Sequence, residues 1–276
     1  MRKNPVPAGL GLRTLAEGLD HPEGVCWSPF DGYVYAGGEA GQLYRFPVEG
    51  GSPQLVTTVE GGFLLGIAFD GAGALYVCDS NHHRVWRVDA DGSREPYGDE
   101  IDYPNYPAFD PDGALWVSDS GSVDEPTGRL YRIHPGGRTE EVTPRPILYS
   151  NGLAVRDGWL YVVESAMPGV SRMPLAGGDL ETVVELPRTT PDGLAFDEDG
   201  GLWIGCYQPN RVYRLDPGGT LETVVDDWTG EYVLSPTNLA FAGPNLEALV
   251  LASLCGWWVK AINPGVRGAR LEYPDL

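Results

Sequence analysis

One short pattern recurs six times along the chain, and it limits the possible folds more than any other feature. The pattern begins with glycine, proline or asparagine, continues with a short apolar segment and ends in a large side chain. Its copies end at Trp27, Phe69, Phe109, Val155, Phe196 and Phe241. The end residues, called anchors below, are 40 to 46 residues apart. A period of this length is typical of β-propeller blades, each of which is one four-stranded unit.

The residues that follow each anchor support four strands per repeat. A turn such as Asp110–Gly113 leads into a second apolar strand such as 115–117, and 130–133 then alternates apolar and polar residues as a third strand. A shorter, more polar fourth strand follows in several repeats, for example 182–185. We therefore predict an all-β, six-bladed propeller of four-stranded blades, forming one domain over residues 1–276.

The sixth repeat is short after Pro264, whereas residues 12–17 precede the first anchor and resemble a fourth strand. We expect this N-terminal segment to complete the sixth blade. Pairing of the N- and C-terminal segments would close the ring and remove an exposed sheet edge.

Charge and composition exclude several kinds of partner. The formal net charge is −20, so a partner with many phosphates, such as nucleic acid or an anionic membrane surface, is disfavoured. The four cysteines are far apart and include no CxxC pair, which argues against a zinc finger or a dense disulfide framework. No apolar run is long enough to cross a bilayer, and residues 1–5 lead into no signal-peptide core. We expect a cytoplasmic protein; its oligomeric state is left open.

The repeat also predicts a site. The innermost strands of a propeller line its central axis, so positions four residues ahead of the anchors should form a ring at one mouth. Four of the six positions carry oxygen donors, and the full ring is Glu23, Leu65, Asn105, Asn151, Asp192 and Thr237. Carboxylate and amide oxygens suit a hard divalent cation. Alternatively, such residues cap turns at strand starts.

Further carboxylates follow the second strands and should reach the same face. They are Asp79, Asp119 and Glu164, with Glu39 just beyond its strand. They could hydrogen-bond the ligand residues or the substrate, or serve as an auxiliary base next to the site. Alternatively, they are solvated loop carboxylates. The Asp-x-Asp-Gly segments, such as Asp197–Gly200, lack the later ligands of a calcium loop and are interpreted as turns.

Three motifs resemble the gluconolactonase and senescence-marker-protein (regucalcin) family. They are His21-Pro-Glu-Gly24 with Trp27, Asn151-Gly-Leu-Ala154, and Pro191–Asp197 followed by Leu202–Tyr207. The resemblance implies a six-bladed propeller with one divalent cation bound by Glu23, Asn151 and Asp192, and a substrate-contacting Asn105. It favours calcium, with magnesium, manganese or zinc as alternatives. Tyr103 and Tyr106 stand where the family often has polar residues, so we expect them to contact a less polar substrate.

The resulting hypothesis is metal-dependent hydrolysis of a lactone or related cyclic ester, a small-molecule substrate, with Asp192 as ligand and general base. Two alternatives stay open at this point. One is a propeller that binds a small molecule or cation without turnover, since fold alone does not decide function. The other is a different metal-assisted reaction on the same site, such as an isomerisation or a cyclisation.

Overall fold

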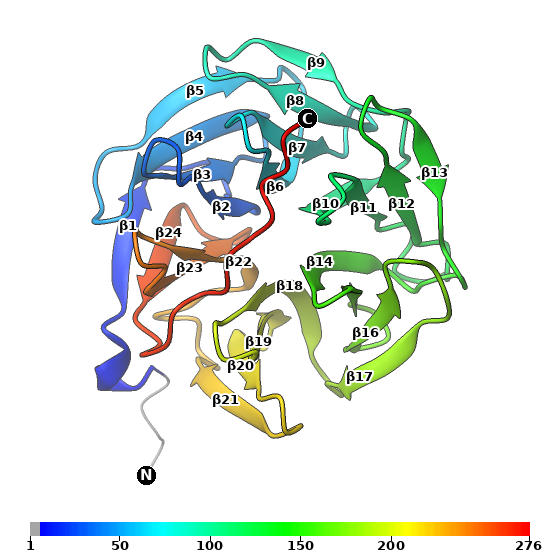
Figure 1. Ribbon diagram of the computed structural model, residues 1–276. Helices are drawn as coiled ribbons and strands as arrows, with labels where there is room; N and C mark the ends of the chain where they lie inside the picture. Colours follow the sequence, from blue (N-terminus) through cyan, green and yellow to red (C-terminus); the bar gives the residue numbers. More distant parts are fainter. Residues whose placement is uncertain (1–5) are drawn as a thin grey trace.

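The computed structural model describes residues 6–276 as six four-stranded antiparallel sheets arranged around one axis (Figure 1). The predicted six-bladed propeller is confirmed. One short 3-10 helix, Ala8–Leu10, precedes the first strand. No helix in this part of the chain is long and apolar enough to span a membrane. Residues 1–5, on which the expectation of no signal peptide partly depends, lie outside the described residues.

Each blade runs from the axis outward in chain order, apart from the sixth. The innermost strands are β2 (Val25–Trp27), β6 (Leu64–Phe69), β10 (Pro104–Phe109), β14 (Ser150–Arg156), β18 (Thr190–Phe196) and β22 (Pro236–Ala242). The second strands are β3 (Tyr33–Gly37), β7 (Leu75–Asp79), β11 (Leu115–Asp119), β15 (Trp159–Glu164), β19 (Leu202–Gln208) and β23 (Ala248–Ser253).

The outer strands are shorter on average and more exposed. The third strands are β4 (Gln42–Pro47), β8 (Arg84–Val88), β12 (Arg129–Ile133), β16 (Gly169–Pro174), β20 (Arg211–Leu215) and β24 (Trp258–Ile262). The fourth strands are β5 (Gln54–Thr58), β9 (Arg94–Pro96), β13 (Thr139–Glu141), β17 (Glu181–Glu185), β21 (Leu221–Asp226) and β1 (Arg13–Glu17). Strand β9 is exposed throughout, whereas β7 and β11 are buried throughout because a neighbouring blade packs on each face.

The N-terminal segment closes the ring as predicted. Strand β1 pairs antiparallel with β24, with Arg13 opposite Ala261 and Glu17 opposite Trp258. Leu15 and Ala16 are buried in a core cluster shared by the sixth and first blades. Six such clusters lie between neighbouring blades, so each blade is stabilised by apolar contact with the next.

The Asp-x-x-Gly segments after the anchors are turns, as the sequence indicates. In the fifth blade, Asp197 Oδ1 accepts the Gly201 N–H at 2.7 Å, while Oδ2 accepts from Trp203 Nε1 at 2.9 Å and Arg214 Nε at 2.7 Å. Burial alone would raise the pKa of Asp197, but these bonds hold it below its usual value. The carboxylate therefore links the turn to the second and third strands of its blade.

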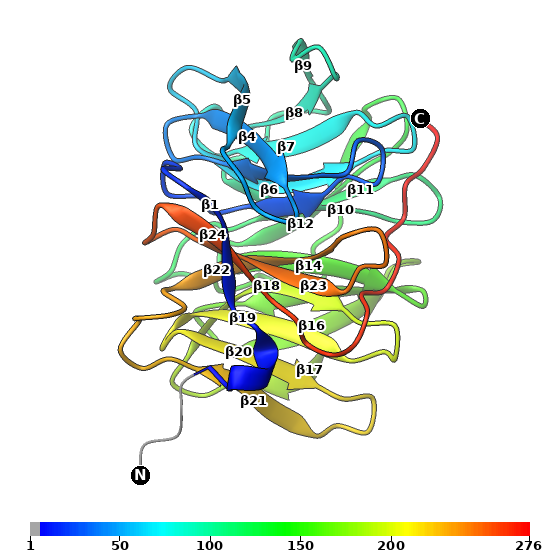
Figure 2. The same ribbon diagram turned by 90° about the vertical axis from the view of Figure 1, so that its left-hand side faces the viewer.

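The C-terminal segment has a role that the sequence did not indicate. After β24 it crosses the mouth of the ring opposite the predicted site, visible as the red trace in Figure 1 and on one face in Figure 2. Ala269 N–H bonds to the Phe196 carbonyl at 2.9 Å and Gly71 N–H to the Pro274 carbonyl at 2.7 Å, which joins the fifth blade to the second. It covers a cavity of about 1330 Å³ lined by the anchor ends of the innermost strands.

Candidate functional site

The four oxygen-bearing ring residues all lie at or just before the start of an innermost strand. Glu23 precedes β2, while Asn105, Asn151 and Asp192 lie in β10, β14 and β18. Each is buried, with exposed fractions between 3% and 6%. Because the strands start at one mouth and end at the cavity under the C-terminal segment, these side chains belong to the mouth on the far side from that segment.

Glycines allow the innermost strands to approach one another at this mouth. Position three ahead of the anchor is glycine in four blades: Gly24, Gly66, Gly152 and Gly193. A Cβ at Gly152 would lie 2.3 Å from the Asp192 carbonyl oxygen, and one at Gly24 would lie 1.9 Å from that of Leu65. No real Cβ contact is so short, so the spacing of the ring requires glycine here.

We predict that Gly152→Ala disturbs the site through the backbone. The new methyl group must push the Asp192 backbone away, because a carbonyl cannot rotate aside as a flexible side chain can. Overpacking of this kind costs about 1–3 kcal/mol of folding free energy. Calorimetric titration with the cation proposed below should show weaker binding than in wild type. Gly9→Ala, where a Cβ meets no close atom and the backbone is not left-handed, should leave that binding unchanged. Unchanged binding in Gly152→Ala would contradict this role.

The sixth blade contributes a residue that the ring argument missed. The ring position, Thr237, is turned aside, and its hydroxyl donates to the Glu23 backbone carbonyl at 2.7 Å. The next residue, Asn238, is fully buried and places Nδ2 3.5 Å from both carboxylate oxygens of Glu23 and 3.5 Å from Asp192 Oδ1. Its signal in the sequence was an asparagine where four other blades have glycine. Leu65 packs in a core cluster and offers no donor.

Burial raises the pKa of both carboxylates at this mouth. Burial, followed by repulsion from Asp192, raises the pKa of Glu23 well above its usual value. Burial raises the pKa of Asp192 to about 7, with the Asn151 amide opposing the shift. It is energetically unfavourable for both buried carboxylates to be ionised when they share one amide donor, unless a positive charge lies beside them.

Three amide oxygens at this mouth lack partners. Asn105 Oδ1, Asn151 Oδ1 and Asn238 Oδ1 are buried and accept no hydrogen bond from any residue that the structure describes. The amide nitrogen of Asn151, by contrast, donates to Ser165 Oγ at 3.2 Å, which fixes its side chain. Unsatisfied buried acceptors are costly. Together with the two carboxylates, they form an all-oxygen donor set that fits a hard divalent cation.

The carboxylates after the second strands are occupied with structural bonds. Asp79 accepts from the Phe63 N–H at 3.0 Å, from His82 Nδ1 at 2.7 Å and from Trp86 Nε1 at 2.9 Å. Glu164 is held by both terminal nitrogens of Arg145, at 2.9 and 2.7 Å. Asp119 accepts the backbone N–H groups of Tyr103 at 3.2 Å and Gly121 at 3.1 Å. Their proposed support of the site is therefore indirect, through the loops they hold.

The two tyrosines flanking Asn105 lie in different surroundings. Tyr103 is half-buried just before β10, and burial raises the pKa of its phenol. Tyr106 is buried, packs with Trp116 and Leu153, and lines the cavity under the C-terminal segment. Contact of either ring with substrate stays a prediction.

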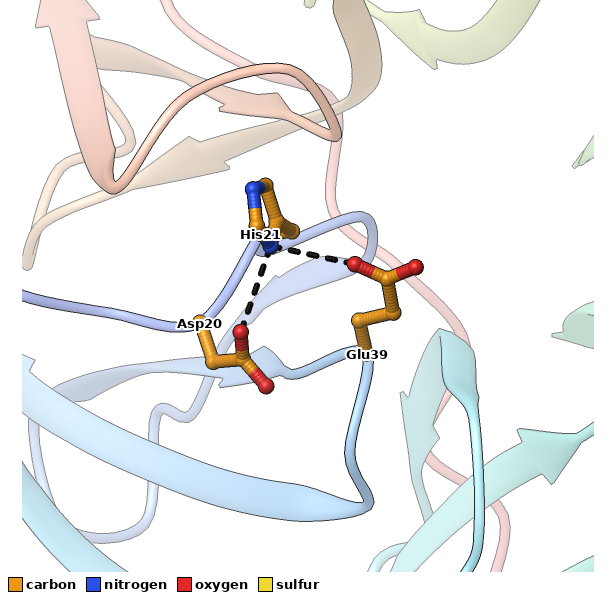
Figure 3. Close-up of side chains that lie close together, drawn as sticks. All are labelled: Asp20, His21 and Glu39. Atoms are coloured by element: carbon orange, nitrogen blue, oxygen red, sulfur yellow. Dashed lines mark hydrogen bonds and ion pairs between the residues drawn. The ribbon is translucent and has the colours of Figure 1, made fainter.

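A separate cluster lies in the loops of the first blade (Figure 3). His21 Nδ1 lies 3.2 Å from Asp20 Oδ1 and 3.0 Å from Glu39 Oε2, an arrangement with ligand spacing for a metal. However, Trp257 Nε1 donates to His21 Nε2 at 2.9 Å. Since an indole nitrogen only donates, the proton of a neutral His21 is on Nδ1, which then donates to the carboxylates. The cluster therefore serves to hold Trp257.

The sequence matches a family model with the description SMP-30/Gluconolactonase/LRE-like region over residues 97–254, more than half of the chain. The chain belongs to this family. An NHL repeat is also matched over residues 63–88. The family resemblance expected from the motifs is thus confirmed. The matched range covers blades three to five and strands β22 and β23 of the sixth blade, and it includes Asn105, Asn151, Asp192 and Asn238.

Relatives with named activities are similar over most of the chain. Pentonolactonase XacC of Haloferax volcanii is 28% identical, covering 85% of this chain and 81% of the relative. A 6-deoxy-6-sulfogluconolactonase of Pseudomonas putida is 27% identical, covering 78% and 76%. The crystal structure of a calcium-binding regucalcin from Agrobacterium tumefaciens shares the fold, with a TM-score of 0.80 at 18% identity, and covers 97% of this chain and 98% of that one.

Proposed function

We propose that the protein is a divalent-cation-dependent hydrolase of lactones or related cyclic esters. The observation that carries the proposal is the convergence of two buried carboxylates and three unpartnered amide oxygens at one mouth of the propeller. Membership of a family that includes named lactonases supports the reaction class. The all-oxygen donor set suits hard cations such as calcium and magnesium, and calcium is favoured because relatives of the chain include regucalcins, one of them described as calcium-binding.

Glu23, Asn151 and Asp192 would hold the cation, and Asn238 would keep the two carboxylates together through its Nδ2. When bound, such an ion polarises a carbonyl and stabilises the negative charge that develops on its oxygen. Asn105 would orient the lactone ring by its amide, which is buried and has a free acceptor oxygen.

Asp192 would act as the general base. Its carboxylate would take one proton from the attacking water as the water oxygen bonds to the ring carbonyl carbon. The bond between that carbon and the ring oxygen then breaks, and the proton passes to the departing alkoxide. The product is the open hydroxy acid, so every atom of lactone and water is retained.

Removal of the cation tests this proposal. Protein treated with EDTA should no longer hydrolyse any lactone of a test panel, and added calcium should restore the hydrolysis. The reaction is measured with a pH indicator, which reports the proton released by the product acid. Magnesium, manganese and zinc are compared at equal free concentration to identify the effective ion. The same additions should raise the melting temperature, because a ligand that binds only the folded state stabilises it. Hydrolysis that survives EDTA, or no hydrolysis with any ion, would refute the proposal.

A further inference from the structure

The cavity beneath the C-terminal segment is lined by three successive layers of apolar residues. The layers are the anchors, the residues one position ahead of them and the residues two positions ahead, and every member lines the cavity. The middle layer has the smallest side chains: Cys26, Ala68, Ala108, Ala154, Ala195 and Ala240. Because these six side chains are small, they leave room along the axis for a cavity of about 1330 Å³.

Tyr106 borders the inner end of this cavity. It stands three positions ahead of its anchor, where four other blades have glycine. All six residues of this layer are within the described chain, and Tyr106 alone among them lines the cavity. Its ring packs with Trp116 and Leu153, and a Cβ at Gly66 would lie 2.7 Å from Tyr106 Cδ2. The phenol is therefore held against the second blade, on the side of the cavity that faces the oxygen donors.

The hydroxyl group of Tyr106 has no partner. The residue is only 8% exposed, yet its hydroxyl forms no hydrogen bond with any residue that the structure describes. Its backbone N–H, by contrast, donates to Ser118 Oγ at 3.0 Å. Burial raises the pKa of the phenol, so the hydroxyl stays protonated at neutral pH and can both donate and accept. A buried hydroxyl without a partner is costly, and one at the wall of an apolar cavity is suited to orient a ligand.

The charged groups of the cavity lie at its outer end and are of both signs. Three arginines and four carboxylates line it, all at strand ends, in turns or on the C-terminal segment. The three apolar layers include no charged side chain. A charged molecule that entered them would lose its water without gaining an opposite charge, which is unfavourable. The interior of the cavity therefore favours a neutral molecule.

The C-terminal segment covers the cavity between two fixed points. On one side, the Glu198 N–H bonds to the Arg267 carbonyl at 2.8 Å. On the other, the Tyr273 ring packs edge-on against Phe30, with the ring centroids 5.6 Å apart. Residues 270–272 between these points are exposed, and their backbone groups form no hydrogen bond with the described part of the chain. We expect a molecule to enter past these three residues, because no blade has to open.

We infer that this cavity is a second binding site, separate from the oxygen donors, for a neutral and mainly apolar molecule with one hydrogen-bonding group. The apolar layers bury the body of the molecule. The Tyr106 hydroxyl bonds its polar group, and so gains the partner that it lacks in the empty cavity. A bicyclic phenol has this chemistry. Binding at this site requires neither the cation nor lactone hydrolysis.

Two probes that differ by one hydroxyl group, 2-naphthol and naphthalene, test the inference. Equilibrium dialysis against the full-length protein should show saturable binding of 2-naphthol, which EDTA leaves unchanged. Tyr106→Phe should weaken binding of 2-naphthol by about 3- to 10-fold, the contribution of one hydrogen bond, and change that of naphthalene by less than about twofold. Its melting temperature without ligand should be at least that of wild type, because the variant loses only an unpartnered polar group.

A variant that fills the cavity gives a second test. Ala108 lies two residues after Tyr106 in β10 and packs against the same core cluster, so Ala108→Phe places a ring in the cavity beside the phenol. It should weaken binding of both probes by about tenfold or more, since the space is taken. Ala90→Phe, in the exposed turn between β8 and β9, is the matched control and should bind both probes as wild type does.

Cys26 reports the location of the bound molecule without any substitution. It lines the cavity, whereas Cys255 is exposed in the loop after β23, on the side of the oxygen donors. At ten times its dissociation constant, 2-naphthol should slow the reaction of Cys26 with methyl methanethiosulfonate by about tenfold and leave that of Cys255 unchanged. Mass spectrometry of peptides measures both rates.

Three results would overturn the inference. The first is that 2-naphthol does not bind. The second is that it protects Cys255 in place of Cys26, or binds equally well to Ala108→Phe, since either result places it outside the cavity. The third is equal affinity for wild type and Tyr106→Phe, which would show that the hydroxyl group of Tyr106 does not serve a ligand.

Discussion

Asp192→Asn is expected to reduce lactone hydrolysis by about 10²- to 10⁴-fold, the usual contribution of a general base. The same change should stabilise the cation-free protein. In wild type, Asp192 and Glu23 are both buried and lie on either side of one amide nitrogen, so their charges repel in a medium that screens them poorly. An asparagine at position 192 has nearly the same shape and removes that repulsion.

The stabilisation by calcium should then be much smaller in the variant than in wild type. Wild type gains about 2.7 kcal/mol when calcium is present at 100 times its dissociation constant, whereas the variant lacks a charged ligand and should gain much less. Urea unfolding with EDTA or with calcium measures both effects. Asp157→Asn, in an exposed turn of the fourth blade, is the control and should behave as wild type. A variant that keeps its activity, or that calcium stabilises as much as wild type, would show that Asp192 does not serve the site.

The fold could be predicted from the sequence because the number and the spacing of the repeats determine the number and the size of the blades. Six anchors at blade spacing predicted six sheets, and a polar-faced strand left over before the first anchor predicted that β1 pairs with β24. The C-terminal segment escaped prediction for a physical reason. It adds no strand to any blade and is held largely by backbone bonds such as that of Ala269 N–H to the Phe196 carbonyl, which residue types do not reveal.

The candidate site was predictable only as far as each blade obeys the repeat. Glu23, Asn105, Asn151 and Asp192 share one register position, and the structure buries all four at one mouth. Asn238 stands one residue later, because Thr237 bonds to the Glu23 carbonyl and leaves its neighbour to reach the carboxylates. This shift of the donor from one residue to the next depends on a hydrogen bond between one hydroxyl and one carbonyl, which the sequence pattern does not show. Strict periodicity therefore assigned the sixth blade no donor, although it provides one.

Asp197→Ala should be strongly destabilising, by about 3–5 kcal/mol of the free energy of unfolding. It breaks a bond from a charged Arg214 and leaves the buried Trp203 N–H and Gly201 N–H without acceptors. Asp199→Ala, an exposed residue in the same turn, is the matched control and should stay within about 0.5 kcal/mol of wild type.

The second blade allows the contribution of the ion pair between Asp197 and Arg214 to be estimated, because the equivalent aspartate there has no arginine partner. Asp70 accepts from Ala72 N–H, Ala74 N–H and the Tyr76 hydroxyl, but it makes no salt bridge with an arginine within residues 6–276. Asp70→Ala should therefore cost less than Asp197→Ala. Equal losses in the two variants would show that the bonds to the turn and the aromatic residue, and not the ion pair, hold the blade together.

Acid should remove the contribution of Asp197. Because its pKa in the folded protein lies below the usual value, its stabilisation is complete above about pH 4, the ordinary pKa of aspartate, and is lost as the pH falls through the lower folded value. Chemical unfolding between pH 7 and pH 2 should thus show wild type and Asp197→Asn approaching each other at the acid end. A difference that stays constant over this range would mean that the negative charge of Asp197 is not what stabilises the fifth blade.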